Sequence, residues 1–245
     1  MEIGEVRLWK LTRREVREAL AAGRIQAAIL PTGSTEQHNE HLAMEHDTAS
    51  ALHVAHHAAL ALYPRVVVAT PVAVGLSEHW MDFAGTLTLK PETFVAVAYD
   101  ICDSLRRHGI DRILILNGHA GNAPLGAHME EFRNRLGADV RFANYWEAYS
   151  AELVRAQMET GKMPAHAAEF ETSFAMAAFP ENVRWQGVDY ERAGLVIRRP
   201  PGYAEEDPAA HREAKTLATG AKGRVMVDAA IAWTAQKLRE MLGEA

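Results

Sequence analysis

Residues 27–48 read AAILPTGSTEQHNEHLAMEHDT, an apolar run that changes abruptly into a cluster of carboxyl and imidazole groups. The apolar run is typical of a buried strand, which we expect over residues 26–31. The cluster contains Glu36, His38, Glu40, His41, Glu45, His46 and Asp47. Neutral imidazole and carboxylate are ligands of divalent metal ions. In an open α/β sheet, sites lie at the carboxyl ends of strands, so this stretch predicts a metal site there.

Along the rest of the chain, strand-like runs alternate with helical patterns. We expect further strands over 65–70, 112–116 and 139–144, and helices over 11–22, 48–62, 91–108, 123–136, 166–178 and 228–242. Thr12 is a candidate cap of the first helix, and Pro200-Pro201-Gly202 predicts a surface loop. The alternation predicts one α/β domain over residues 1–245, with a mostly parallel central sheet and helices on both faces.

Composition excludes several classes of protein. The 245 residues are 48% hydrophobic and 24% charged, which is typical of a globular chain with a sizeable core. The net charge is −6 without a Lys/Arg cluster, which argues against a nucleic-acid partner and against anionic membranes. No apolar run approaches the ~20 residues of a membrane helix.

The cysteine content and the first residues suggest a compartment. Cys102 is the only cysteine, so no intramolecular disulfide can form, and the N-terminal stretch is too charged for a signal peptide. We therefore expect a cytoplasmic protein. Cys102 lies in a helical pattern, where a buried core thiol is the expected role.

Two later segments repeat the polar character of residues 36–47. The segment NGHAGN, residues 117–122, follows a predicted strand and places His119 at its end; HAAEFETS, residues 166–173, begins a predicted helix. In extended backbone Glu36 and His38 point to the same side, and Asp47 can return to them from the loop. Carboxylates at the start of a helix are favoured by its dipole.

Each feature also has an ordinary structural explanation. A single histidine after a strand is more often a hydrogen-bonded structural residue, and an acidic first turn can be simple helix capping. Glu40, His41, Glu45 and His46 cannot all be ligands, so some of them should support the site or face solvent. The histidines at 53, 56 and 57 are expected on a helix surface or in the core. Three such segments at strand or loop ends nevertheless favour a site.

Other catalytic patterns fit less well. The chain has no H-E-x-x-H, no P-loop and no G-x-G-x-x-G after a strand. The segment from Gly75 to His79 resembles a nucleophile elbow but lacks its final glycine.

Four blocks in order resemble the creatininase family of metal-dependent amidohydrolases. They are residues 30–48, GLSEHWMDFAGTLTL at 75–89, NGHAGN and HAAEFETS. The resemblance implies an α/β fold with two adjacent divalent ions per chain, usually zinc or manganese with iron possible, and often a hexamer. Position by position, it implies metal ligands at Glu36, His38, Asp47 (bridging both ions) and His119. It also implies a proton-transfer role for His166.

One position departs from that family's pattern. Creatininases proper have a metal-binding glutamate two residues after the histidine of NGH, where this chain has Gly121. Branches that resemble formamide deformylases and peptide-maturation enzymes also have glycine there. In those branches the glutamate of the ETS motif, here Glu171, can complete the metal site.

The resulting hypothesis is hydrolysis of a small amide, cyclic amide or formamide. Two bridged ions can lower the pKa of a water from about 15.7 to near 7, for attack on the carbonyl. His166, with Glu169 in reach, would deliver a proton to the leaving nitrogen. Trp146 is expected either as a pocket wall or as a core aromatic. The alternatives are a peptidase for a small peptide, and a metal-binding assembly subunit without catalysis.

Overall fold

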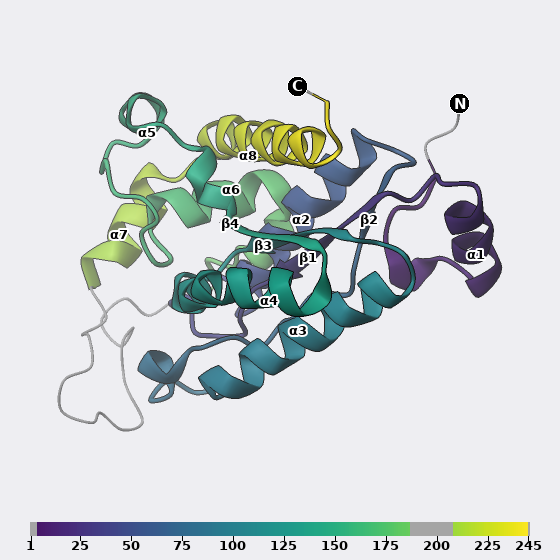
Figure 1. Cartoon of the computed structure of the whole chain (residues 1–245). Helices are drawn as coiled ribbons and strands as arrows, with labels where there is room; N and C mark the ends of the chain where they lie inside the picture. The colour runs from purple at the N-terminus through teal and green to yellow at the C-terminus, as the bar shows by residue number, and fades with distance from the viewer. Residues whose placement is uncertain (1–3, 187–207, 245) are drawn as a thin grey trace.

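The computed structural model describes residues 4–186 and 208–244 (Figure 1); the loop predicted at Pro200-Pro201-Gly202 lies outside these ranges. Its strands are β1 (Ala27–Thr32), β2 (Val66–Val68), β3 (Arg112–Asn117) and β4 (Asp139–Asn144). Its α-helices are α1 (Arg13–Ala21), α2 (His46–Leu60), α3 (Pro91–Arg107), α4 (Met129–Leu136), α5 (Ala151–Gln157), α6 (Glu169–Ala178), α7 (Pro208–Leu217) and α8 (Gly220–Met241). Short 3-10 helices include η2 (Glu78–Trp80), η3 (Ala120–His128) and η4 (Tyr145–Ala148).

The four strands form one sheet in the order β2-β1-β3-β4, and every neighbouring pair is parallel. All six residues of β1 are buried, because alternate side chains enter different cores. Ile29 belongs to the core on one face and Leu30 to the core on the other. Such burial on both faces is typical of a parallel sheet. It confirms the predicted α/β fold.

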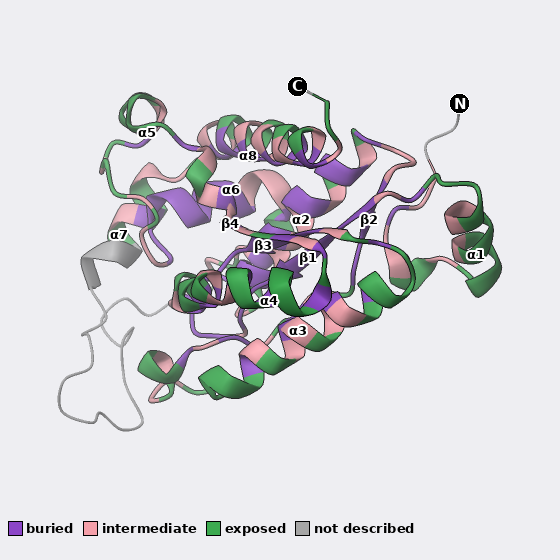
Figure 2. Cartoon of the chain, in the orientation of Figure 1, coloured by how far each residue is buried: buried purple, intermediate pink, exposed green. Residues whose placement is uncertain are grey.

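Helices cover both faces of the sheet (Figures 1 and 2). The helices α2, α6 and α8 contribute Val54, Phe170 and Met226 to one core. On the opposite face, α3 and α4 contribute Phe94 and Phe132 to the other core. Figure 2 shows the buried inner faces of these helices turned toward the sheet and their exposed faces outward.

The strand order opens a crevice between β1 and β3. The chain leaves β1 for α2 on one face of the sheet, whereas the chain leaving β3 reaches α4 on the opposite face. Where neighbouring strands send their connections to opposite faces, a crevice forms outside their carboxyl ends, and this is where open α/β sheets bind ligands. The polar segments after β1 and β3 lie at this crevice.

The predicted elements are largely present. Thr12 caps α1 in a reciprocal capping box with Glu15, and Cys102 is a buried free thiol in the core beneath α3. The helix expected from residue 166 begins three residues later, at Glu169, and the helix expected from residue 228 begins earlier, at Gly220. No helix in the described ranges is long and apolar enough to cross a membrane.

Candidate metal centre

Two adjacent segments supply the first part of the centre. Glu36 and His38 lie in the loop after β1, and Asp47 lies in the first turn of α2. All three side chains are buried. Asp47 stands between two imidazoles, with its Oδ1 3.1 Å from His38 Nε2 and its Oδ2 3.0 Å from His119 Nδ1. The α2 dipole favours the Asp47 carboxylate at this end of the helix.

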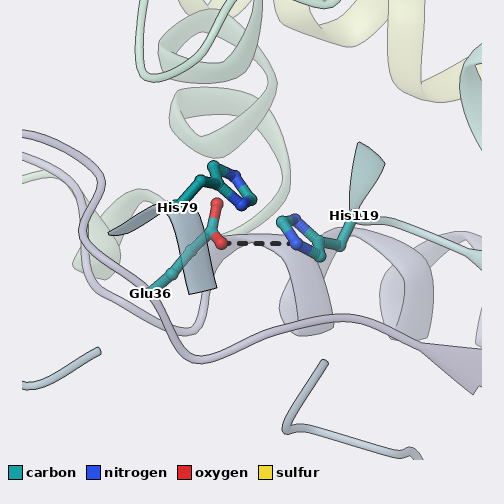
Figure 3. Close-up of side chains that lie close together, drawn as sticks. All are labelled: Glu36, His79 and His119. Carbon is teal, nitrogen blue, oxygen red and sulfur yellow. Dashed lines mark ion pairs between the residues drawn. The ribbon is translucent and has the colours of Figure 1, made fainter. Parts of the chain in front are cut away.

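The turn after β3 brings His119 to the same point. Asn117 holds this turn, because its amide nitrogen donates to the carbonyl oxygen of His119 at 2.6 Å and its amide oxygen accepts from Thr32 Oγ1 at 3.0 Å. His119 Nε2 lies 3.4 Å from Glu36 Oε2. The pair is drawn in Figure 3, where the imidazole of His79 stands beside the carboxylate. Glu36, Asp47 and His119 thus lie together at this point.

Glu171 reaches the centre from the first turn of α6. Its Oε2 lies 3.7 Å from His38 Nε2 and accepts a hydrogen bond from the backbone N–H of Ala167 at 2.5 Å. Gly121 has no side chain that could reach the centre. A Cβ at this position would overlap the carbonyl oxygen of Leu76 and Nε2 of His119, so the turn has no room for one. The five residues predicted as metal ligands therefore converge, and Glu171 provides a carboxylate that the Gly121 loop cannot.

His166 stands at the side of the cluster, in the loop before α6. Its Nδ1 lies 3.7 Å from Glu36 Oε1, and its ring stacks on Trp80 with centroids 4.6 Å apart. The backbone N–H of Asn39 donates to Gln37 Oε1 at 2.9 Å, so Gln37 Nε2 donates to His166 Nε2 at 2.8 Å. Because Nε2 accepts this bond, the neutral ring carries its proton on Nδ1, on the side of Glu36.

The structure does not bring Glu169 to His166. Its buried carboxylate accepts hydrogen bonds from the backbone N–H groups of Glu159 and Thr160, at 3.1 and 2.9 Å. It also accepts from Lys222 Nζ of α8 at 2.6 Å. The predicted participation of Glu169 in proton transfer therefore has no support in this geometry. Its contacts instead connect α6 to α8 through Lys222.

The charges of the centre balance one another. Burial raises the pKa of Glu36 and that of Glu171 to about 7 each. Burial would also raise the pKa of Asp47, but the imidazoles of His38 and His119 hold it well below its usual range. Burial opposes a charge on His38, but the carboxylates of Asp47, Glu171 and Glu36 together outweigh it and raise that pKa to about 10. Protonated imidazoles thus offset carboxylates in a position that cations could occupy.

Two buried oxygens indicate that a metal fits here. Asp47 Oδ2 and Glu36 Oε2 have no hydrogen-bonding partner among the described residues, although nitrogens of His119 lie 3.0 and 3.4 Å away. A buried carboxylate oxygen without a donor is costly, and a cation would satisfy it. The chemistry of the donors, carboxylate oxygen with imidazole nitrogen, suits zinc, manganese or iron.

Three sets of three side chains within the described ranges place one ligand atom each within 4.8 Å of one another. They are Glu36 with His79 and His119, Glu36 with His38 and His166, and His38 with His46 and Glu171. His79 and His46 were not predicted as ligands. His79 lies in the block GLSEHW, whose histidine was the available signal. His46 was one of several candidates in the first cluster, and its burial depends on where α2 begins.

A pocket of about 160 Å³ opens above the cluster. Its lining includes the predicted residues Glu36, Asp47, His119, His166 and Glu171. Its walls include His79, Trp80, Trp146 and Pro164. Trp146 also packs against the core, so both roles expected for it are present. The volume is below the roughly 300–1,000 Å³ of drug-sized ligand sites, and it therefore suits a small molecule or one end of a larger one.

A parallel α/β sheet with buried carboxylates and imidazoles at its switch point is the architecture expected of a metal-dependent α/β enzyme. The sequence profile of the creatininase family, described as creatinine amidohydrolase, matches residues 9–238. This chain belongs to the creatininase family. Solved creatininase structures agree: a mutant of the Zn-Zn type superposes with a TM-score of 0.76 and a manganese form with 0.74. Each is 26% identical and covers 97% of this chain and 98% of the other.

Curated relatives have different activities. Creatinine amidohydrolase of Pseudomonas putida is 27% identical over 94% of this chain and 95% of that protein. Mycofactocin precursor peptide peptidase of Mycobacterium ulcerans is 28% identical over 80% of this chain and 78% of that protein. The 3-dehydro-scyllo-inosose hydrolase of Thermotoga maritima is 27% identical over 80% of this chain, which spans only 63% of that protein. The relatives share hydrolysis and differ in substrate.

Proposed function

We propose that this chain is a metal-dependent hydrolase of a small amide or another non-peptide C–N bond, such as a cyclic amide or a formamide. The observation that carries the proposal is the convergence of three buried carboxylates and two imidazoles beneath a small pocket walled by His166. We further propose two divalent ions per chain, a cytoplasmic location and a homo-oligomer, with a hexamer as the expected form.

The residues have separable tasks in this proposal. Glu36, His38, Asp47, His119 and Glu171 would hold the two divalent ions, with Asp47 between them, because its two oxygens face different imidazoles. When bound, the ions would lower the pKa of a water and polarise the scissile carbonyl. Trp80, Trp146 and Pro164 wall the pocket and would limit the size of the substrate.

His166 is the proposed proton-transfer residue. Its Nδ1 carries the ring proton on the pocket side, where a leaving nitrogen would lie, and Trp80 holds the plane of the ring. The imidazolate anion is too basic to form near pH 7, so His166 would release its Nδ1 proton to the leaving nitrogen while Nε2 takes up a proton from water. The Gln37 amide, which holds the ring at Nε2, can stay in contact after this exchange by presenting its oxygen to the new Nε2–H.

The test combines metal content with turnover. Zinc- and manganese-loaded protein is assayed with a panel of creatinine, cyclic amides, formamides, short peptides and 3-dehydro-scyllo-inosose. We expect turnover of a small amide, abolition of turnover by chelation, and a loss of roughly 10²–10⁴-fold in kcat in His166→Ala. Full turnover in His166→Ala would refute the proton-transfer role.

A peptidase of small peptides is the second candidate, favoured by the likeness to mycofactocin precursor peptide peptidases. Turnover of peptides alone in the panel would establish it. Metal binding without any turnover would instead support a non-catalytic assembly subunit.

A further inference from the structure

His46 is a buried imidazole with few hydrogen-bonding partners. It is the first residue of α2, and 1% of its surface is exposed. Its Nδ1 has no hydrogen-bonding partner among the described residues, and its Nε2 lies 3.4 Å from Ser50 Oγ. A buried nitrogen without a partner is costly, so this arrangement requires an explanation.

The surroundings of His46 are those of a ligand. Its ring centroid lies 5.0 Å from that of His38, and one ligand atom each from His38, His46 and Glu171 lie within 4.8 Å of one another. Bonds of about 2.0–2.2 Å to one zinc ion hold nitrogen and oxygen ligands up to roughly 4 Å apart. Small side-chain rotations would therefore close these three groups on a single ion.

The turn after β3, which contains Gly121, cannot provide a further ligand beside His38, because a side chain at Gly121 would collide with Leu76 and His119. The first turns of α2 and α6 provide His46 and Glu171. Asp47, the neighbour of His46 in α2, already contacts His38 Nε2 at 3.1 Å.

We propose that His46 is a metal ligand, and that His38, His46 and Glu171, with Asp47 shared, form an inner site for a nitrogen-preferring divalent ion such as Zn²⁺. His38 and His46 do not line the pocket, whereas Glu36 and His119 do. The inner site is thus covered on its two imidazole sides and reaches the pocket only through Asp47 and Glu171, whereas the outer site of Glu36, Asp47 and His119 lies wholly in the pocket lining. This inference rests on the proposed function in that it assigns a ligand to one of its two ions.

A purely structural role for His46 makes different predictions. The ring meets Phe179 edge-on at 5.7 Å, and a packed core imidazole would affect folding stability without binding metal. A residue that only supports a ligand would lower metal affinity by roughly 10–100-fold on removal. Removal of a ligand should cost more and should also change the spectrum of the bound ion.

The experiment titrates metal-free full-length chain with Co²⁺ and Zn²⁺ and measures stoichiometry, affinity and the cobalt absorption spectrum. We expect His46→Ala to lose one of two ions, or to bind it more than about 100-fold more weakly, with an unchanged far-UV circular dichroism spectrum. The matched control is His53→Ala, on the same helix and in none of the three ligand sets, which should bind both ions as the wild type does. His46→Cys should restore binding and show thiolate-to-cobalt charge-transfer absorption.

Two results would overturn the proposal: wild-type affinity for both ions in His46→Ala, or cobalt binding by His46→Cys without the charge-transfer band. Should both variants fail to fold, the anomalous density of a zinc-loaded wild-type crystal decides: one zinc about 2.0–2.1 Å from a His46 nitrogen is expected, and the absence of any zinc at that distance would refute the proposal. Because no arm uses a substrate, binding of both ions with His46 as a ligand of one, in a chain that turns over nothing in the substrate panel, would refute the proposed hydrolase and leave this inference intact.

Discussion

At the scale of single residues, Gly121 shows how an absent side chain shapes the centre. Gly121→Ala should destabilise the fold by about 1–3 kcal/mol, as overpacking does, because its Cβ would overlap Leu76 and His119. The affinity for metal should fall together with the stability, because the added Cβ would displace the His119 imidazole. Urea unfolding and zinc titration measure the two effects. Gly220→Ala, whose Cβ would meet Met176 at an ordinary 3.6 Å, is the control, and equal stability of the two variants would contradict the prediction.

Gln37 offers a second test at this scale. Gln37→Leu removes the hydrogen bond to His166 Nε2, so the ring should lose its fixed orientation. We expect kcat to fall roughly tenfold, a fraction of the 10²–10⁴-fold that general acid–base catalysis contributes, with KM and metal content unchanged. In a His166→Ala background the same change should have no further effect on kcat. Additive losses in the double variant would show that Gln37 acts independently of His166.

The residues of the site were only partly predictable. Glu36, His38 and His119 could be placed because they follow apolar runs that read clearly as strands. Glu171 was assigned to the metal site through the family resemblance, but the position of Glu169 was not predictable: residues two apart on a helix project to nearly opposite sides, and nothing in the sequence says which side faces Lys222. His46 was ambiguous for a related reason: its burial follows from the start of α2 at that residue, and helix boundaries are poorly specified by sequence.

At the scale of elements, the ion pair of Glu169 and Lys222 connects α6 to α8. Lys222 Nζ donates to Glu169 at 2.6 Å, to Glu159 at 3.0 Å and to the Leu217 carbonyl at 2.8 Å. Glu169→Gln should therefore lower the free energy of unfolding by about 1.5–3 kcal/mol, the value of hydrogen bonds to charged groups. If Glu169 were instead catalytic, fully folded Glu169→Gln protein would be as inactive as His166→Ala.

The same pair predicts a pH dependence of stability. Burial opposes the Glu169 charge, but Lys222 and the backbone N–H groups outweigh it and lower the pKa of Glu169. A carboxyl whose pKa is lower in the folded state stabilises the fold above its unfolded pKa, about 4.3. The stability difference between wild type and Glu169→Gln should hold at pH 6–8 and shrink as the pH falls below about 4. A stability difference that grew as the pH fell would contradict a stabilising ion pair between Glu169 and Lys222.

The boundaries of two helices could not be predicted, for steric reasons. α6 begins after Ala167, whose φ of +48° interrupts a helix and leaves His166 in a loop. α8 begins eight residues before its predicted start, across Gly220 and Gly223, which read as helix breakers. A Cβ at Gly223 would overlap the Ser173 carbonyl, so that glycine permits α6 and α8 to cross closely. Such a crossing depends on tertiary contacts that no local pattern records.

At the scale of the whole molecule, the metal centre joins segments that are distant in sequence. Glu36, His119 and Glu171 come from the loop after β1, the turn after β3 and the first turn of α6. The parallel sheet predicted from strand–helix alternation implied that strand ends would meet at one edge. It could not show that α6 would approach that edge, because α6 packs against α2 and α8, a contact between helices without a signature in sequence.

Because these distant segments share the centre, metal binding should stabilise the whole fold. Folded chain holds the ligands together and unfolded chain does not, so an ion at 100 times its dissociation constant adds about 2.7 kcal/mol to the free energy of unfolding. For a chain of this size that corresponds to a rise in Tm of roughly 5–10 °C. Scanning calorimetry with zinc and after chelation measures it. Asp47→Asn, which weakens the carboxylate facing both His38 and His119, should lose most of the zinc-dependent rise. An equal Tm for wild type with and without metal would mean that the convergence of these residues does not bind zinc.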